Sequence, residues 1–385
     1  MKVAYLLTQD KGGPVDVTVR LAATLAASGE AEVRVFGPVP SRGAELIAGC
    51  HEVVSVANKG DLRAGRRARD ALRAWRPDVV HAQDRRAGLV SAGLRLRHKV
   101  VQTYHGVPDD VRQEWFRGAR GAAGPSTYTR TVLAADAGVA RFVHRTIVPA
   151  PAMRDFLVRR LGVPAHRVAH IDNCVELPVP CPPLGPVRKL IFVGLLVERK
   201  GLLTLLDALA RPGVMPPDAS LTVIGSGPLC EVAARQAQRD LAGRVSFLGF
   251  RTDVPDQLRR HDALVLPSTM EQQPLVVAEA MAAGKPVVAT DTGGVADMLA
   301  LPEGSAGSDG LASSGSWASS GGLVPPGDVG ALAARLAALF ADPDPGRTGR
   351  ALAERARARF APDVCAERHL ALYRELVSGP SLVQA

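Results

Sequence analysis

Short apolar runs alternate along the chain with longer amphipathic stretches, a pattern typical of parallel βαβ units. Between the first two runs, Val17, Leu21 and Leu25 recur at a helical spacing and predict a helix with one apolar stripe. Residues 61–76 predict a second helix, whose polar side consists mostly of arginine. The apolar runs themselves predict buried strands at residues 3–7, 33–36, 53–56, 79–82, 100–103 and 146–149.

A proline-rich segment at residues 177–186 interrupts this alternation. Its five prolines exclude a helix interior or a central strand, so we expect a stiff linker. Two successive open α/β halves predict two facing Rossmann-like domains, with ligands bound in the cleft between them at the carboxyl ends of the strands. The strands predicted after the linker are residues 190–193, 221–224, 245–248, 263–266 and 286–290.

The length of 385 residues also suits two domains rather than one. Within the second domain, residues 302–322 are rich in glycine and serine and predict a flexible surface insertion, or alternatively a mobile lid held by Trp317. The predicted divisions are a first domain at 1–176, the linker at 177–186, a second domain at 187–362, and a closing helix with a polar tail at 363–385.

Net charge leaves the class of ligand open. The chain has 47 Lys and Arg against 38 Asp and Glu, a formal charge of +9. A basic balance could serve nucleotide phosphates, nucleic acid or an acidic membrane. Because arginine greatly outnumbers lysine and alanine is abundant, as under high-GC coding, we attribute the overall charge to composition and seek the anion site in motifs.

Cysteine spacing and hydropathy exclude several classes of protein. The cysteines have no zinc-binding spacing and predict reduced thiols. No apolar stretch approaches the roughly 18 residues of a membrane span, and the run at residues 3–7 is too short for a signal peptide. We therefore expect a soluble, cytoplasmic protein. The cysteines are Cys50, Cys174, Cys181, Cys230 and Cys365.

Glycine-rich turns follow several predicted strands, where backbone N–H groups can approach a phosphate. Gly12-Gly13 separates the first strand from the first helix, and Gly225-Ser226-Gly227-Pro228 closes a strand of the second half. Neither is a dinucleotide fingerprint or a P-loop, and Gly12-Gly13 alone is also ordinary turn chemistry. Lys200, before Gly201 at another strand-to-helix transition, could stabilise a diphosphate leaving group or could be a solvated charge.

Residues 268–297 carry the strongest chemical signal. Glu271 precedes a helix that Pro274 can open, and Glu279 falls on the second turn of that helix. Both carboxylates can therefore face one cleft, where they would accept hydrogen bonds from sugar hydroxyls. Thr292-Gly293-Gly294 follows the next strand as a further tight turn that exposes backbone.

Residues 264–297 resemble the EX7E region of glycosyltransferase family 4, whose members are retaining enzymes with the GT-B fold. Other segments resemble the family in the same order over most of the chain. These segments are Gly12-Gly13, Thr103-Tyr104-His105-Gly106, Ile171-Asp172-Asn173-Cys174-Val175-Glu176, Gly194 with Lys200-Gly201, Gly225-Ser226-Gly227-Pro228, and Val245-Ser246-Phe247-Leu248-Gly249-Phe250 leading to Asp262-Ala263.

The resemblance implies that the first domain binds an acceptor and the second a nucleotide sugar, with the helix after Asp363 returning to the first domain. It implies that Glu279 holds the donor ribose, that Glu271 and His105 lie near the transferred sugar, and that Lys200 contacts the diphosphate. The implied catalytic residues are Glu271, His105 and Lys200. The implied donor-binding residues are Gly12, Gly13, Arg199, Lys200, Gly225, Gly227, Phe250, Arg251, Glu271, Pro274, Leu275, Val276 and Glu279.

Three positions depart from the family pattern. Leu195 stands where the family often has an arginine, so a cation is missing there or is supplied by Arg199. Gln272-Gln273-Pro274 replaces a proline-phenylalanine-glycine sequence, and proline has no N–H to donate to the sugar. Cys174 replaces a glycine. The identity of the sugar is therefore left open.

The sequence shows no second carboxylate placed for a double displacement. The resemblance implies instead a same-face substitution in which the departing phosphate takes the acceptor's proton. Because no Asp-x-Asp motif follows a strand, we expect no required metal and no other cofactor. The expected reaction moves a hexosyl or aminohexosyl group from a nucleoside-diphosphate sugar, UDP-linked rather than GDP-linked, to a hydroxyl of an aminocyclitol, an inositol-like compound or a natural-product aglycone.

Other functions remain open at this point. A membrane-lipid or cell-envelope acceptor would give residues 61–76 and Arg85-Arg86 a lipid surface to contact, although we favour solvated faces for both. A nucleotide-sugar epimerase of similar shape would need no acceptor pocket. An inactive nucleotide-sugar-binding protein would explain Leu195 and Gln272-Gln273-Pro274. No nucleic-acid partner is expected.

Overall fold

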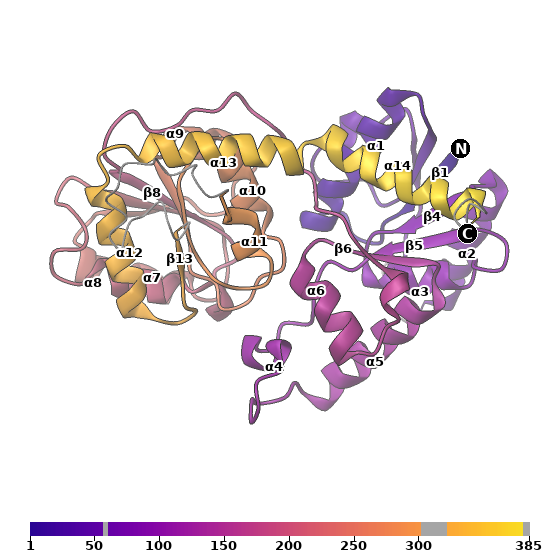
Figure 1. The fold of residues 1–385 in the computed structure, drawn as a ribbon, viewed down its shortest axis with the longest axis horizontal. Helices are drawn as coiled ribbons and strands as arrows, with labels where there is room; N and C mark the ends of the chain where they lie inside the picture. The colour runs from indigo at the N-terminus through magenta and orange to yellow at the C-terminus, as the bar shows by residue number, and fades with distance from the viewer. Residues whose placement is uncertain (57–60, 302–321, 380–385) are drawn as a thin grey trace, which may run out of the picture. The chain divides into compact units, whose positions relative to one another are not determined.

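The computed structural model describes residues 1–56, 61–301 and 322–379, and it divides the chain into two compact units (Figure 1). The first unit comprises Met1–Val175 together with Arg359–Ala385, and the second comprises Glu176–Ala358. The predicted insertion, apart from its last residue, and the end of the predicted tail lie outside the described residues.

The first unit is built on a sheet of seven parallel strands in the order β3-β2-β1-β4-β5-β6-β7. Its elements are β1 (Lys2–Leu6), α1 (Gly13–Ser28), β2 (Glu32–Gly37), η1 (Ala44–Ile47), β3 (His51–Val53), α2 (Leu62–Trp75), β4 (Val79–Ala82), α3 (Arg85–Ala92), β5 (Lys99–Thr103), α4 (Gln113–Arg117), α5 (Thr127–Phe142), β6 (Arg145–Val148), α6 (Pro151–Asp155), η2 (Phe156–Arg160), η3 (Ala165–Arg167), β7 (Val168–His170) and, from the end of the chain, α14 (Pro362–Ser378).

Helices cover both faces of this sheet because its strands are apolar on both sides. Ala4 and Leu6 of β1 pack in a core with residues of α2, α3 and α5. Tyr5 points to the opposite face, where its hydroxyl lies 3.1 Å from that of Tyr373 in α14. Figure 1 shows α1 and α14 side by side, and α14 packs against α1.

The second unit repeats the architecture with six parallel strands in the order β10-β9-β8-β11-β12-β13. Its core contains residues of β8 and β9 together with α7, α8 and α12. Its elements are β8 (Lys189–Val193), η4 (Glu198–Lys200), α7 (Leu202–Leu209), β9 (Ser220–Ile224), α8 (Cys230–Leu241), β10 (Val245–Phe247), α9 (Val254–Arg260), β11 (Ala263–Leu266), α10 (Leu275–Ala282), β12 (Val287–Thr290), α11 (Val295–Leu299), β13 (Leu323–Val324), α12 (Val329–Ala341) and α13 (Pro345–Phe360).

These two parallel-sheet, Rossmann-like units confirm the predicted α/β fold class. In each sheet the strand order reverses once, between β1 and β4 in the first unit and between β8 and β11 in the second. Such a reversal opens a crevice outside the carboxyl ends of the strands, which is where open α/β sheets bind ligands.

The chain returns to the first unit at Arg359, a few residues before the predicted helix at 363. The buried carboxylate of Asp172 explains why the chain joins the first unit at Arg359. It accepts hydrogen bonds from the Arg359 Nη2 at 2.9 Å and the Arg368 Nη1 at 3.2 Å. The N–H of Val175 also donates to the carbonyl of Phe360 at 3.0 Å. The outgoing and returning segments are thus fastened together within the first unit.

The proline-rich segment belongs to the second unit. The Cys181 N–H donates to the Ala283 carbonyl at 2.9 Å, and the Lys285 ammonium donates to the Cys181 carbonyl. A Cβ at Gly284, whose φ is +75°, would lie 3.3 Å from Pro180. The segment therefore packs against the turn that follows α10.

Three local features of the strands differ from the sequence prediction. The strand predicted at 53–56 lies earlier in the chain, at residues 51–53, because β3 ends at Val53. Val56 is instead buried in the core beside α2. The strands β7 and β13 were missed, because runs of three and two residues are too short to show a period. Each is held by its neighbour in the sheet, β6 and β12 respectively, which the local sequence does not reveal.

Candidate functional site

A buried ion pair marks the point where the strand order of the second unit reverses. Lys200 ends η4, after β8, and Glu271 lies in the loop after β11. The Lys200 Nζ and the Glu271 Oε1 are 2.5 Å apart, with side chains only 14% and 8% exposed. An ammonium has three donors, so Lys200 can keep this bond and still donate to a second acceptor. Two of the predicted catalytic residues are therefore in contact.

Glycines let the loops around this ion pair approach one another more closely than any other residue would allow. Gly225 has a φ of +135°, and a Cβ there would lie 1.8 Å from the Gly194 carbonyl oxygen. A Cβ at Gly227 would lie 2.5 Å from the Leu196 carbonyl oxygen. The structure thus brings the predicted Gly225 and Gly227 directly against the loop that leads to Lys200.

The loop that carries Glu271 is held in the same way. Gly293, with a φ of +54°, lies so close that a Cβ would be 1.9 Å from the Glu271 carbonyl oxygen. The Gly294 N–H donates to the Gln272 carbonyl at 2.7 Å, and the Thr290 hydroxyl donates to the Ser268 carbonyl. The turn after β12 therefore fixes the backbone of Glu271.

The helix predicted to follow Pro274 is present as α10. Pro274 is the residue before its first turn, which Leu275 and Val276 begin, and Glu279 lies on its second turn, partly exposed. Glu279 also interacts with another group within the protein. The helix thus places Glu271 and Glu279 in succession along one segment of the second unit.

Polar atoms beside the ion pair are buried without partners. Within the described part of the chain, the Ser268 and Thr292 hydroxyls and the Gln272 Oε1 have no hydrogen-bond partner. Buried polar groups in native proteins are almost always satisfied. Their gathering around the loop of Glu271 is what a site that receives a polar ligand requires.

The remaining predicted donor residues follow β8 or β10 of the same sheet, and they differ in exposure and in their contacts. Phe250 is exposed after β10, and Arg251 is bound to Asp253 through two hydrogen bonds of 2.6 and 2.7 Å. The Arg251 guanidinium is therefore already neutralised. Arg199 is partly exposed and has a partner within the protein, whereas Leu195 is exposed.

The predicted residues of the first unit also follow the strands next to its reversal. Gly12, with a φ of +104°, precedes α1, which begins at Gly13. His105 follows β5, and its Nε2 lies 3.4 Å from the Gln83 Oε1. Burial, assisted by the charge of nearby His369, lowers the pKa of His105 to about 4. The imidazole is therefore neutral at physiological pH.

A hydrogen-bond network that the sequence does not reveal holds the loop of His105. The Arg85 Nε donates to both carboxylate oxygens of Asp136 at 2.8 Å, and its Nη2 donates to the Gly106 carbonyl at 3.1 Å. The Tyr104 hydroxyl donates to the same carboxylate at 3.0 Å. No local motif predicts these contacts, because Asp136 lies in α5, which is far from Arg85 in the sequence.

The network corrects the interpretation of Arg85-Arg86 as a solvated or lipid-contacting pair. Arg85 is bound to Asp136, and the Arg86 Nη1 donates to the Val56 carbonyl at 2.6 Å. Both side chains therefore stabilise the first unit from within. The helix predicted at 61–76 is present as α2, and its exposed arginines are Arg63, Arg66, Arg67, Arg73 and Arg76.

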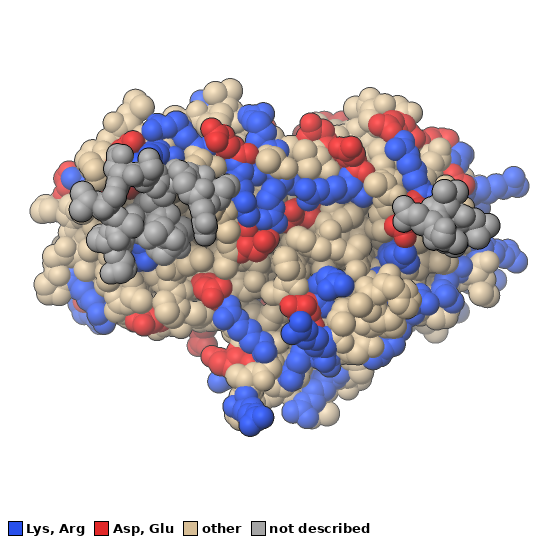
Figure 2. Space-filling view, viewed as in Figure 1, with Lys and Arg blue, Asp and Glu red and all other residues tan. Residues whose placement is uncertain are grey.

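Basic side chains also gather elsewhere on the first unit. Figure 2 shows them over the region that Figure 1 labels α4 and α5. The exposed arginines in and beside these helices and η2 are Arg112, Arg117, Arg120, Arg130, Arg141, Arg159 and Arg160.

The described residues contain neither a metal-binding cluster nor a membrane-spanning helix. Over that part of the chain no three His, Cys, Asp or Glu side chains cluster as a metal site would require, and all five cysteines are free thiols. Among the described helices, none combines the length and the apolar character needed to cross a bilayer.

The chain matches two family profiles, one over each unit. "Glycosyltransferase Family 4" matches residues 11–178 and "Glycosyl transferases group 1" matches residues 187–342. A glycogen synthase of Mycobacterium tuberculosis is 29% identical over 294 residues, which are 73% of this chain and 65% of that protein. The chain thus spans somewhat less than two thirds of that relative.

Two further relatives differ in how far the match extends. A 2-deoxystreptamine glucosyltransferase of Streptomyces kanamyceticus is 30% identical over 65% of this chain and 57% of its own length. A phosphatidyl-myo-inositol mannosyltransferase of Mycobacterium leprae is 28% identical over 97% of this chain and 96% of its own.

Solved structures share the fold over nearly the whole chain. HepE of Anabaena, in complex with UDP and glucose, is 20% identical with a TM-score of 0.73 and covers 97% of this chain and 99% of its own. A sucrose-phosphate synthase of Thermosynechococcus elongatus is 23% identical with a TM-score of 0.73, covering 98% and 99%.

Proposed function

This chain belongs to glycosyltransferase family 4, with the GT-B fold, and on that premise we propose that it is a retaining glycosyltransferase that uses a nucleoside-diphosphate sugar. The observation that carries the proposal is the buried contact between Lys200 and Glu271 at the strand-order reversal of the second unit. A cation and a carboxylate there suit the two parts of such a donor, its diphosphate and its sugar hydroxyls.

We assign the donor to the second unit. Lys200 stabilises the negative charge that develops on the departing diphosphate, and preorganised charge in a water-poor site is an effective way to lower such a barrier. Glu271 orients the Lys200 ammonium and accepts hydrogen bonds from the sugar. Glu279 holds the ribose. A UDP-linked sugar is favoured over a GDP-linked one, supported by the UDP-glucose complex of HepE, which has the same fold.

The chemical step follows from this assignment. The bond between the anomeric carbon and the diphosphate oxygen breaks, and a bond to the acceptor oxygen forms on the same face of the sugar. The acceptor's proton passes to an oxygen of the leaving diphosphate. His105 is neutral at physiological pH and is assigned to the binding of the sugar by a hydrogen bond, with its loop fixed by Arg85 and Tyr104. The protein thus contributes positioning and charge stabilisation.

The proposed acceptor is a small polyol ring, such as an aminocyclitol or an inositol-like compound. The support comes from two relatives whose names specify a cyclitol, 2-deoxystreptamine and phosphatidyl-myo-inositol. Both molecules present several ring hydroxyls. The transferred group would be a hexosyl or aminohexosyl group.

A lipid-linked acceptor is the second candidate. The relative that matches over 97% of this chain is named for a phosphatidyl-myo-inositol substrate. The exposed arginines in and beside α4, α5 and η2 would suit an anionic surface. Assays with a free cyclitol and with its phosphatidyl derivative separate the two candidates.

Donor binding can be measured by thermal unfolding with UDP-glucose, UDP-N-acetylglucosamine and GDP-mannose. One donor at 100-fold over its Kd should stabilise the protein by about 2.7 kcal/mol. Lys200→Gln should abolish that stabilisation. Lys189→Gln is the matched control, because Lys189 is exposed at the opposite end of β8. Stabilisation by none of the three donors would refute the proposed donor site.

Turnover separates a transferase from the other enzymes. Glu271→Gln should lower slow donor hydrolysis and transfer about 100-fold or more, by the loss of a preorganised charge. Glu198→Gln, an exposed glutamate in η4 close to Lys200 in sequence, should leave both rates near wild type. Interconversion of donor epimers without transfer would instead identify an epimerase, and donor binding without turnover a binding protein.

A further inference from the structure

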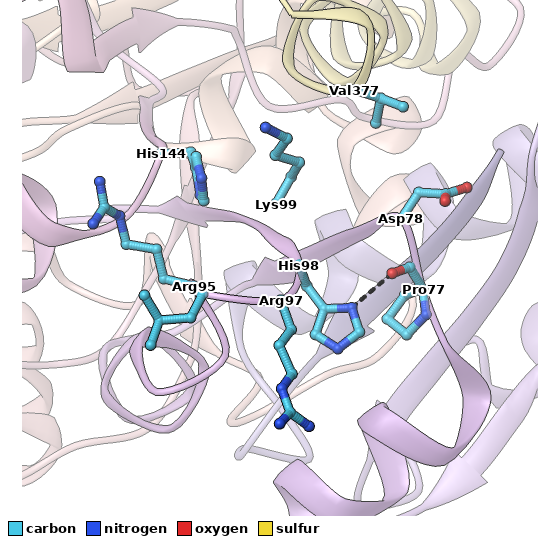
Figure 3. A pocket seen from close by; sticks show the side chains of 9 residues that line it. Pro77, Asp78, Arg95, Arg97, His98, Lys99, His144 and Val377 are labelled. Atoms are coloured by element: carbon cyan, nitrogen blue, oxygen red, sulfur yellow. Dashed lines mark hydrogen bonds between the residues drawn. The ribbon is translucent and has the colours of Figure 1, made fainter.

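A basic pocket lies at the amino edge of the sheet in the first unit, at the opposite end of β5 from His105 (Figure 3). Its volume is about 300 Å³. Asp78 precedes β4, Lys99 begins β5 and His144 precedes β6. His105 follows the other end of β5, and five residues of strand correspond to roughly 16 Å. The pocket is therefore separate from His105.

The pocket carries an excess of positive charge. Arg95, Arg97 and Lys99 line it, and within the described residues none of the three forms an ion pair. The one lining carboxylate, Asp78, is engaged by the backbone N–H of Lys2 at 2.7 Å. The three cations of this pocket therefore outnumber its single carboxylate.

Arg95 is held in place although part of its guanidinium is unsatisfied. Its Cζ lies 5.0 Å from the ring centroid of Phe142, a cation–π contact that restrains the side chain. Its Nε is buried and has no hydrogen-bond partner among the described residues. A buried donor without an acceptor is costly, and an anion in the pocket would satisfy it.

His144 offers a further donor. Its Nδ1 accepts the Val100 N–H at 3.1 Å, so the neutral ring carries its proton on Nε2. Burial, followed by the charges of Lys99, Arg95, Arg167 and Arg145, lowers the pKa of His144 to about 4. Figure 3 shows the polar ends of Arg95 and Lys99 on the same side of the pocket as His144, whereas Arg97 points away.

We propose that Arg95, Lys99 and His144 form a binding site for a phosphate group. A guanidinium, an ammonium and an imidazole N–H are donors of the kind that bind the terminal oxygens of a phosphate monoester. The volume admits a phosphate with a small substituent. The phosphate belongs either to a free metabolite or to a lipid headgroup, for which the 91% exposed side chain of Leu96 at the rim would offer an apolar contact.

The test follows the ring signals of His144 by NMR at neutral pH during titration with inorganic phosphate, with chloride at equal ionic strength as the reference. The signals should shift saturably with phosphate and not with chloride. Arg95→Gln should raise the apparent Kd for phosphate about tenfold or more, as expected for the loss of a charged hydrogen bond. Arg66→Gln is the control of equal charge, because Arg66 is 80% exposed on α2.

Two arms complete the experiment. Lys99→Gln is a second variant in case Arg95→Gln fails to fold, and it should weaken binding in the same way. Vesicles that contain phosphatidic acid, whose headgroup is a phosphate monoester, replace inorganic phosphate in the other arm and are compared with vesicles of phosphatidylcholine. A response confined to phosphatidic acid assigns the site to a lipid headgroup. No His144 response to either probe, or equal responses in the Arg95, Lys99 and Arg66 variants, would overturn the proposal.

Discussion

At the scale of single residues, the candidate donor site depends on positions that have no side chain. Gly201, Gly225 and Gly293 all have positive φ, and a Cβ at each would overlap a carbonyl oxygen of a neighbouring loop. Such residues bring backbone N–H groups and carbonyls close together at the carboxyl ends of strands. The position of Glu271 is consequently set by a residue 22 positions away, since Gly293 lies against its carbonyl.

Gly293→Ala tests this dependence. The left-handed φ alone should cost about 1–2 kcal/mol, and overlap with the Glu271 carbonyl should add to that cost and displace the loop. Donor-dependent stabilisation and turnover should both fall. Gly243→Ala is the matched control, because Gly243 also has a positive φ, +78°, but nothing lies within 4 Å of its Cβ position.

Chemical denaturation of the two variants gives the comparison directly. Gly243→Ala should lose only the cost of the left-handed φ and keep the activity of the parent protein. Equal stability losses in both variants, with activity retained in Gly293→Ala, would show that the loop of Glu271 can relax and that its position is not fixed by Gly293.

At the scale of elements, α14 closes the first unit through a buried chain of polar groups. The His81 Nδ1 lies 2.6 Å from the Tyr373 hydroxyl, and the His81 Nε2 lies 2.8 Å from the Thr103 hydroxyl. The His369 ring packs 5.7 Å from that of His81. Burial lowers the pKa of His81 and lowers that of His369 to about 4. The helix is therefore docked against imidazoles that must stay neutral.

This packing predicts a loss of stability in acid. An unfolded histidine takes up a proton below about pH 6.5, whereas folded His105 and His369 do so only near pH 4. The unfolded state therefore binds more protons between those values. The free energy of unfolding should fall as the pH drops from about 6.5 to 4, by at most about 1.4 kcal/mol per pH unit for each histidine.

Urea denaturation at several pH values measures that slope. His369→Gln removes one of these histidines and should make the slope shallower by up to one proton. His166→Gln replaces an exposed histidine of the same unit and should leave the slope close to that of the parent. A pH-independent free energy of unfolding from 6.5 to 4.5 would contradict the role assigned to the buried imidazoles.

At the scale of the whole molecule, the two units differ in how the chain builds them. The second unit is continuous in sequence, Glu176–Ala358, whereas the first requires Arg359–Ala385 in addition to Met1–Val175. The residues that α14 buries are Cys365, Ala366, His369, Leu370, Leu372, Tyr373 and Leu376. Each apolar side chain of this size contributes about 1–3 kcal/mol when buried, so α14 is a large part of the first unit's stability.

Fragments should reflect this asymmetry. Residues 176–358 alone should unfold cooperatively, because their core is complete. Residues 1–175 alone should show a lowered Tm or no cooperative transition, and a peptide of residues 359–379 should restore it. Circular dichroism during heating distinguishes the cases. A fragment of residues 1–175 that melted like the first unit of the full chain would contradict the structural role of α14.

The sequence by itself determined the class of fold and the family of the protein, because both depend on local order. The alternation of apolar runs specified most of the strands, and the spacing of Glu271, Pro274 and Glu279 specified the helix α10 and the loop before it. Glycines at the ends of strands marked the ligand edge for the same reason, since the conformations they permit are a property of single residues.

Only the tertiary structure decided which of these residues meet. Lys200 and Glu271 form their ion pair because β8 and β11 are neighbours in the sheet, and Arg85 reaches Asp136 because α3 packs on α5. The strands β7 and β13 and the phosphate site at the amino edge depend on the same kind of pairing. Contacts between distant segments follow from strand order and packing, which no local pattern encodes.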